Sequence, residues 1–201
     1  MTTTDFGPSI LSRPRYGVLQ LRPGSGHLMI ADGEGAQAVL DLVAQGVDLA
    51  TCHIIYSPGT NGVDRAAELL ALGAAQFVRC PTFAAALPRV QKVLSDAHMG
   101  LQMYAAGTEG LMGQVQREVV VAGLPHTALQ MEHRGSLARR VQCVHCKGIT
   151  EDVHTDPFKC SHCGLNLFVR DHYSRRIAAF QGVNIDAEDP GLVPASVERF
   201  T

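Results

Sequence analysis

Four cysteines near the C-terminal end of the chain have the residue type and spacing of a metal site. They form two Cys-x-x-Cys pairs, Cys143 with Cys146 and Cys160 with Cys163, separated by thirteen residues. Each pair can form a tight turn whose thiolates point inward, so that four sulfurs surround one ion tetrahedrally. Zinc accepts this geometry, and so does a single iron ion bound by sulfur alone. The spacing therefore predicts a four-cysteine metal site, with zinc and iron both open.

The predicted ligand set limits what the metal can do. A catalytic zinc normally keeps one coordination position for water, and four thiolates leave none. We therefore expect a structural metal, or an electron relay if the ion is iron. Two redox dithiols or a pair of disulfides are the alternative, which the reducing cytosol expected for this chain does not favour. His145 and His162 lie inside the two motifs and are expected to face solvent.

The composition indicates a protein with a sizeable core and no strong charge preference. The chain has 201 residues, of which 46% are hydrophobic, and a formal net charge of −2. This length suits one ordinary domain and a small second one. The charge offers no general attraction for nucleic acid or anionic membranes. The sequence shows no signal peptide and no apolar run of membrane-spanning length, so we expect a cytoplasmic protein.

An alternation of short apolar runs with helical patterns predicts an α/β domain over residues 1–134. Apolar residues at three- and four-residue steps mark the helices, and strands alternating with helices favour a parallel sheet covered on both faces. Pro88 is expected in the first turn of its helix. Strands are expected at 28–31, 53–56, 77–78, 101–105 and 128–131, with a further one at 16–21, and helices at 35–45, 63–72, 88–97 and 109–122.

The remainder of the chain is expected to form a small separate module. Residues 135–201 are predicted to hold the four-cysteine site in a zinc-ribbon or rubredoxin-like fold, with a strand at 165–169 and an extended tail at 186–194. Residues 1–15 are expected to be an irregular arm. Cys52 and Cys80 lie at the edges of predicted strands and are interpreted as small buried hydrophobes.

A glycine-rich segment follows the first predicted strand. The run Gly33-Glu34-Gly35-Ala36-Gln37-Ala38 fits the G-x-G-x-x-G/A pattern of dinucleotide-binding turns. The other features of a dinucleotide-binding site are missing. Ser57 stands where an acid for the ribose is expected, and Asp32 adds negative charge where phosphate would bind. A plain strand-to-helix turn is therefore favoured. Gly33 and Gly35 remain weak candidates for cofactor binding.

Three segments of this domain resemble the nucleotide-binding domain of ferredoxin–NADP reductases. They are residues 27–35, 55–57 and 104–112, in which Ala106 and Thr108 replace the cysteine and proline usual in the family. The resemblance implies the same parallel sheet. The family's flavin-binding barrel does not fit in the 26 residues before His27, so we expect a degenerate scaffold rather than a reductase.

A second resemblance covers most of the C-terminal third. Residues 133–147, 160–176, 179–183 and 186–188 resemble the small subunit of bacterial dimethylamine monooxygenase. This implies a subunit of a multicomponent complex that uses NAD(P)H and dioxygen to demethylate dimethylamine to methylamine and formaldehyde. Haem is then expected in a catalytic partner subunit, and flavin with a [2Fe–2S] cluster in a reductase partner subunit. The four cysteines carry over as metal ligands.

This resemblance implies a chain that acts in assembly or electron transfer and is not catalytic alone. No residue has the layout of a general base or of a nucleophile beside one, so no catalytic residue is predicted. Tyr173, Arg175 and Arg176 are predicted to dock a partner, extended by Arg134, Arg139 and Arg140; the alternative is a solvated charged loop.

Two other functions compete with this one. A stand-alone NAD(P)-dependent oxidoreductase is disfavoured by the missing ribose acid and flavin domain. A zinc ribbon that binds nucleic acid is disfavoured by the net charge of −2, because phosphate binding depends on excess positive charge.

Overall fold

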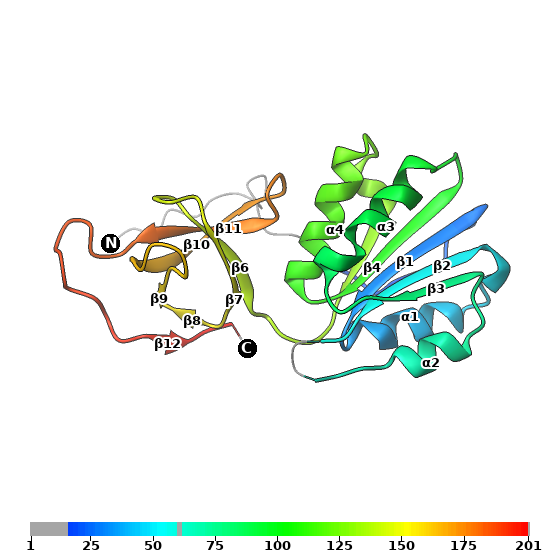
Figure 1. Ribbon diagram of the computed structural model, residues 1–201, viewed down its shortest axis with the longest axis horizontal. Coiled ribbons are helices and arrows are strands. Elements are labelled where there is room, and N and C mark those ends of the chain that lie inside the picture. The colour runs from blue at the N-terminus through cyan, green and yellow to red at the C-terminus, as the bar shows by residue number, and fades with distance from the viewer. Residues whose placement is uncertain (1–15, 60–61, 201) are drawn as a thin grey trace.

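A five-stranded parallel sheet forms the core of the N-terminal part of the protein (Figure 1). The computed structural model describes residues 16–59 and 62–200. The strand order is β3-β2-β1-β4-β5, so the chain reverses its direction across the sheet between β1 and β4. This confirms the predicted parallel sheet. The strands are β1 (Gly26–Asp32), β2 (Cys52–Ser57), β3 (Gln76–Arg79), β4 (Leu101–Gly107) and β5 (Leu129–His133).

Helices cover both faces of this sheet, as the alternation predicted. On one face α1 (Gly35–Val43) and α2 (Ala66–Ala71) pack on a cluster of thirteen buried residues that includes Met29. On the other face α3 (Phe83–Ser95) and α4 (Glu109–Val121) pack on a second cluster of thirteen, which includes Leu28. Neighbouring residues of β1 therefore enter opposite cores, because side chains alternate along a strand.

The third helix begins earlier than expected, and the predicted place of Pro88 is wrong. α3 starts at Phe83, where the Thr82 hydroxyl caps it by accepting from the N–H of Ala85 (3.2 Å), so Pro88 lies inside the helix. Pro88 and Ala84 both lie on the exposed face. Water can therefore bond the carbonyl that proline leaves without a donor, which makes an interior proline tolerable there.

Residues 16–21 do not form the predicted strand. The segment lies alongside β5 in space, and a backbone hydrogen bond runs from the N–H of Gly17 to the carbonyl of Met131 (2.9 Å). The next donors bond to side chains instead: the N–H of Leu19 donates to Glu132 Oε2 (2.7 Å) and that of Gln20 to Gln130 Oε1 (3.0 Å). Side chains of β5 thus replace the backbone ladder. The expected arm, residues 1–15, lies outside the described residues.

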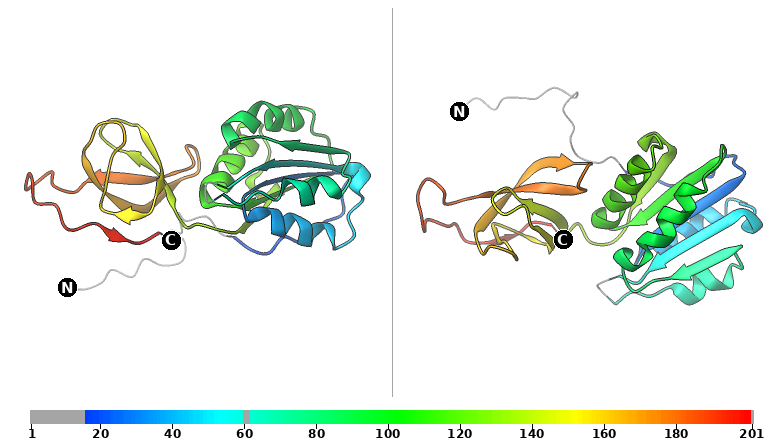
Figure 2. Two further views of the ribbon diagram at one scale, coloured as in Figure 1. Left: turned by 60° about the horizontal axis from the view of Figure 1, so that its bottom comes forward. Right: turned by 45° about the horizontal axis from the view of Figure 1, so that its top comes forward.

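The C-terminal region forms a second lobe with its own sheet, which both views of Figure 2 show beside the parallel sheet. Its order is β7-β6-β11-β10-β9, and β12 pairs with β8 in a two-stranded ribbon. We call this lobe the metal module and the N-terminal lobe the α/β domain; the division at residue 134 stays a prediction. The strands are β6 (Arg139–Cys143), β7 (Ile149–Val153), β8 (Thr155–Asp156), β9 (Phe158–Lys159), β10 (Asn166–Ser174), β11 (Ala179–Asn184) and β12 (Val197–Glu198).

Two features of the described residues bear on the remaining expectations. β10 runs on to Ser174 with an irregularity between Arg170 and Tyr173, so Tyr173 lies in a strand, whereas Arg175 and Arg176 lie in the turn that follows it. Within residues 16–59 and 62–200, none of the helices combines the length and the hydropathy needed to cross a membrane.

Candidate metal centre and the carboxyl edge of the parallel sheet

The two cysteine pairs lie in turns of the same geometry. In the first turn the N–H of Lys147 donates to the carbonyl of Cys143 (3.0 Å), and in the second the N–H of Gly164 donates to the carbonyl of Cys160 (3.0 Å). Lys147 and Gly164 each stand four residues after the first cysteine of their pair, and both have positive φ (64° and 75°). A tight turn of this kind requires one left-handed residue, which glycine adopts freely and lysine at some cost. The local sequence thus shapes each half of the site separately.

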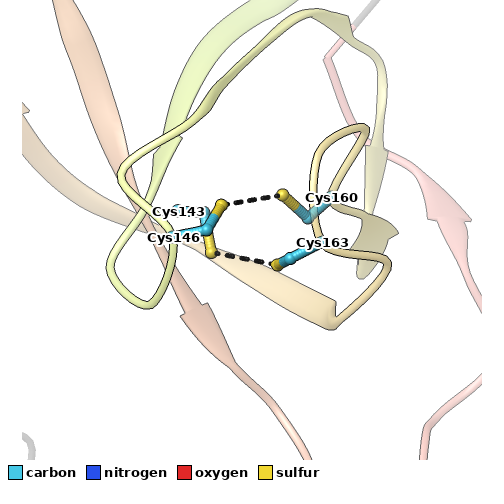
Figure 3. A group of neighbouring side chains, drawn as sticks. All are labelled: Cys143, Cys146, Cys160 and Cys163. Carbon is cyan, nitrogen blue, oxygen red and sulfur yellow. Dashed lines mark hydrogen bonds between the residues drawn. The ribbon is translucent and has the colours of Figure 1, made fainter.

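The fold brings the two turns together so that the four sulfurs converge (Figure 3). All four Sγ atoms lie within 4.8 Å of one another. The Sγ atoms of Cys143 and Cys163 are 3.9 Å apart, and those of Cys146 and Cys160 are 3.7 Å apart. A tetrahedron with metal–sulfur bonds of about 2.3 Å has edges of about 3.8 Å. The sulfurs therefore already stand at the spacing that a tetrahedral site with four thiolate ligands requires.

The surroundings of the sulfurs are apolar on one side and open on the other. Cys143 and Cys160 are buried and pack with Leu167, whereas Cys146 and Cys163 lie toward solvent. A metal bound here would be anchored in the core of the module and would have one edge near the surface. Such a position suits a structural ion, and it would also leave a path for electrons if the ion were iron.

The two histidines of the motifs lie outside the sulfur group, as expected. His145 is exposed, and the ring of His162 bonds through Nε2 to the carbonyl of Ile149 (2.8 Å). That ring packs so closely on Gly148 that a side chain there would collide with it. His162 therefore joins the two turns and leaves ligation to the cysteines.

The thiols of the site divide their protons unequally. Burial opposes ionisation of Cys160, yet hydrogen bonds from the backbone N–H groups of Cys163 and His162 and from the thiols of Cys163 and Cys146 outweigh it and lower the pKa of Cys160 to about 6. At Cys163 the N–H of Leu165 lowers the pKa, but partial desolvation and hydrogen bonds to the three neighbouring sulfurs outweigh this and raise the pKa to about 12. The Cys163 thiol thus keeps its proton and shares it with the neighbouring sulfurs, and a bound cation would take the place of that proton.

The glycine loop lies at the other candidate site, where β1 ends. Gly33 has positive φ (43°), and Gly35 packs so closely on the backbone of Ala106 that an added Cβ would collide with its carbonyl. Gly35 is therefore required for the contact between α1 and β4. This accounts for its presence without a nucleotide, so both glycines remain proposals as cofactor-binding residues.

Protein groups fill the place where the strand order reverses. The Asp32 carboxylate, at the end of β1, accepts from the N–H of Thr108 (2.8 Å) and from its hydroxyl (2.6 Å), after the end of β4. Burial raises the pKa of Asp32, although both bonds from Thr108 lower it. Gly107 permits this approach, because a side chain there would collide with the carboxylate. In open α/β sheets ligands bind at such a reversal, and here the Asp32–Thr108 pair occupies it.

The two lobes meet at this edge of the sheet. A cavity of about 270 Å³ is lined by the first turn of α4 and by polar residues of the metal module, among them Arg140 and His154. Deeper in the contact, Gly113 of α4 admits the hydroxyl of Tyr173 so closely that a Cβ would collide with it. The metal module therefore packs against the carboxyl edge of the sheet.

Only part of the predicted docking group is accessible. Tyr173 is 6% exposed and packs edge-on against Phe180, with ring centroids 5.0 Å apart, so the structure corrects its interpretation as a surface anchor. Arg175 and Arg176 are exposed and keep their proposed role. Of the three arginines proposed to extend this group, Arg139 and Arg140 are largely buried, whereas Arg134 bonds Glu132 and stays partly exposed, so its role remains a proposal.

The sequence did not predict that the Arg139 side chain is buried against aromatic rings. Its guanidinium lies over the rings of Phe180 (4.0 Å) and Phe200 (4.3 Å), and it is 4% exposed. Its partners come from distant strands and from the C-terminal end, so no local pattern could have indicated the contact. Arg139 thus stabilises the core of the module instead of its surface.

The protein is thus of a two-part type, in which a parallel α/β domain carries a four-cysteine metal module on the carboxyl edge of its sheet. Comparison with known proteins agrees on both parts. The family model described as dimethylamine monooxygenase subunit DmmA-like, N-terminal domain, matches residues 8–129, and the model of its C-terminal domain matches residues 140–183. The chain therefore belongs to the DmmA-like family of dimethylamine monooxygenase subunits.

A curated relative carries a related name. The heme-dependent oxidative N-demethylase delta subunit of Ectopseudomonas mendocina (strain ymp) is 28% identical over 146 residues, which cover 70% of this chain and 83% of the relative.

Solved structures give weaker similarity. The flavohemoglobin of Malassezia yamatoensis has a TM-score of 0.43 and 18% identity, and the match covers 57% of this chain and 33% of that one. The siderophore-interacting protein SipS of Aeromonas hydrophila has a TM-score of 0.40 and 18% identity, with 57% and 53% covered.

Proposed function

We propose that this chain is a subunit of a demethylating oxygenase and that it acts in assembly or electron transfer without an active site of its own. Membership of the DmmA-like family supports this, as does the name of the relative from Ectopseudomonas mendocina. The observation that carries the proposal is the set of four converging thiolates, Cys143, Cys146, Cys160 and Cys163, in a chain of this family. Four thiolates leave a bound metal no position for substrate or water.

The finer proposal names the reaction and the partners. The complex demethylates dimethylamine oxidatively to methylamine and formaldehyde, with NAD(P)H and dioxygen as co-substrates, in the cytoplasm. Haem belongs to the catalytic subunit, and flavin with a [2Fe–2S] cluster belongs to the reductase subunit. Arg175 and Arg176 dock one of these partners, because exposed guanidinium groups can form bidentate hydrogen bonds with carboxylates.

The α/β domain acts in this proposal as a scaffold for the metal module. A stand-alone NAD(P)-dependent oxidoreductase would need an open crevice where the strand order reverses, and the Asp32–Thr108 pair occupies it. Gly33 and Gly35 are then vestiges of a nucleotide loop, which would have bound pyrophosphate through backbone N–H groups.

Metal analysis with an absorption spectrum, on protein co-purified with its partner subunits, tests the role of the cysteines. One colourless zinc ion per chain identifies a structural subunit. One iron ion with thiolate charge-transfer bands that bleach on reduction identifies an electron relay. Absence of stoichiometric metal from the wild-type complex would contradict the proposal at its central observation.

Co-purification tests the docking role. A chain carrying both Arg175→Gln and Arg176→Gln is expected to bind its partners at least about tenfold more weakly, because each charged contact contributes roughly 1.5–3 kcal/mol when made. Arg117→Gln, on the exposed side of α4, is the matched control and should leave the complex intact. Equal recovery of the partners with both proteins would remove Arg175 and Arg176 from the interface.

A further inference from the structure

A cavity lies at the amino-terminal edge of the parallel sheet, away from the metal module. It has a volume of about 410 Å³, within the usual range for sites that bind small molecules. Its floor comes from residues at the beginnings of four strands, among them His53 and Leu101, and its wall from the second half of α3. The carboxyl edge that carries Thr108 and the glycine loop is at the other end of these strands, so the cavity is separate from the sites described above.

A buried nitrogen without a partner lies beside this cavity. His53 aligns with Leu28 of β1 and Gln76 of β3, so its side chain lies on the same face of the sheet as Leu28, the face that α3 covers. Its Nδ1 atom is buried and has no hydrogen-bond partner among the described residues. A buried polar atom left without a partner costs roughly 1–3 kcal/mol, so native proteins rarely keep one without a ligand or water.

The wall of the cavity supplies an unpaired positive charge. Arg89 of α3 lines the cavity, is half-buried, and has no ion pair among the residues that the structure describes. Lys92, one turn further along the helix, differs because it is paired with Asp96 (2.8 Å). The cavity therefore keeps one uncompensated cation, and a guanidinium in a concave site favours a planar or tetrahedral anion.

The lining also offers apolar surface among its polar residues, and it does not suit a metal. Val93 and Leu101 supply aliphatic surface, which requires an apolar part of the ligand if it is to be covered. Several histidines lie near the cavity. Among the described residues, however, the four cysteines are the one group of three or more His, Cys, Asp or Glu side chains whose ligand atoms converge. The occupant must therefore combine a negative group with an apolar body.

We propose that this cavity binds a small organic anion. Its acidic group pairs with Arg89, its apolar body packs on Val93 and Leu101, and an atom of the ligand completes the hydrogen bonding of His53. A carboxylate and a phosphate monoester share this chemistry. The site makes the α/β domain a ligand-binding unit, independent of the role proposed for the metal module.

Isothermal titration calorimetry on the metal-loaded full chain tests the proposal with benzoate, phenyl phosphate and inorganic phosphate. We expect saturable binding of benzoate or phenyl phosphate, with the tighter of the two identifying the acidic group, and a change in the imidazole nitrogen signals of His53 in NMR spectra. Binding of inorganic phosphate as tight as that of phenyl phosphate would overturn the proposal, because the apolar wall would then contribute nothing. Absence of binding by both aromatic anions would overturn it as well.

Variants separate this site from general anion binding. Arg89→Gln should weaken binding about ten- to a hundredfold, the effect of losing one charge-assisted hydrogen bond, while Arg117→Gln on α4 should bind as the wild type does. His53→Phe keeps the ring and removes the nitrogens, so it should weaken ligand binding and raise the melting temperature of the free protein. Unchanged affinity in Arg89→Gln, with circular dichroism showing a folded chain, would contradict the assignment.

Discussion

The α/β domain and the metal module are stabilised by different means. The domain buries two apolar clusters of thirteen residues each, one on either face of its sheet. The module has a cluster of six around Val141, and one of three that consists of Cys143, Cys160 and Leu167. Apolar burial alone can support the first, whereas small domains commonly need a metal or disulfides. The comparison indicates that one chain combines a self-supporting scaffold with a lobe that depends on its ion.

Removing the ion is the strongest test of this difference. In Cys160→Ser, or after chelation, the module should lose its protected core while the α/β domain stays folded, because structural metal binding contributes on the order of 10–16 kcal/mol to such folds. Hydrogen exchange measured segment by segment would report each lobe separately. Cys80→Ser changes a cysteine outside the sulfur group and serves as the control. Loss of protection in both lobes at once would show that the domain is not self-supporting.

Thr108→Val tests the polar pair that occupies the reversal point of the α/β domain. The substitution removes the cap on the N–H of Leu111 and the hydroxyl bond to Asp32, and we expect a loss of roughly 2–4 kcal/mol in the free energy of unfolding. Thr82→Val on α3 removes a cap alone and should cost about 1 kcal/mol. Urea denaturation measures both. Equal losses would mean that the bond to Asp32 contributes nothing to stability.

Gly113→Ala tests how the two lobes are joined. Alanine is better than glycine in a helix by about 1 kcal/mol, so α4 itself should gain stability. The new Cβ collides with the Tyr173 hydroxyl, however, and should displace the metal module from α4. Small-angle scattering should show a larger radius of gyration. Gly110→Ala should not, because its Cβ would make an ordinary contact with the Thr108 hydroxyl, at 4.0 Å. A compact Gly113→Ala protein would show that Tyr173 moves aside without loss of the contact.

The smallest expected effect concerns pH. Burial raises the pKa of Asp32 in the folded state above its ordinary value of 3.8, so the folded chain holds this proton more tightly than the unfolded chain. The resulting stabilisation is complete below about pH 3.8 and is lost as the pH rises through the raised pKa. Asp32→Asn should therefore gain stability relative to the wild type as the pH rises across that window. Denaturation curves at several pH values would test this, and a constant difference would contradict it.

Local sequence patterns were enough to predict the parts of this protein that depend on near neighbours in the chain. The Cys-x-x-Cys spacing specifies each metal turn, since Lys147 and Gly164 stand at the same position relative to their cysteines. The apolar periodicity likewise specified the parallel sheet and its two covered faces. Turns and periodic patterns are local properties of the chain, and their side-chain directions follow from backbone geometry.

Contacts between residues far apart in the chain arise only when the elements pack together. Asp32 meets Thr108 across 76 residues, and the backbone of Leu19 bonds Glu132 across 113, which turned an expected strand into an irregular segment. The same holds for Tyr173, whose polar neighbours suggested a surface residue until Gly113 and Phe180 enclosed it. Such contacts depend on which surfaces packing brings together, and the chain carries no local signal of that choice.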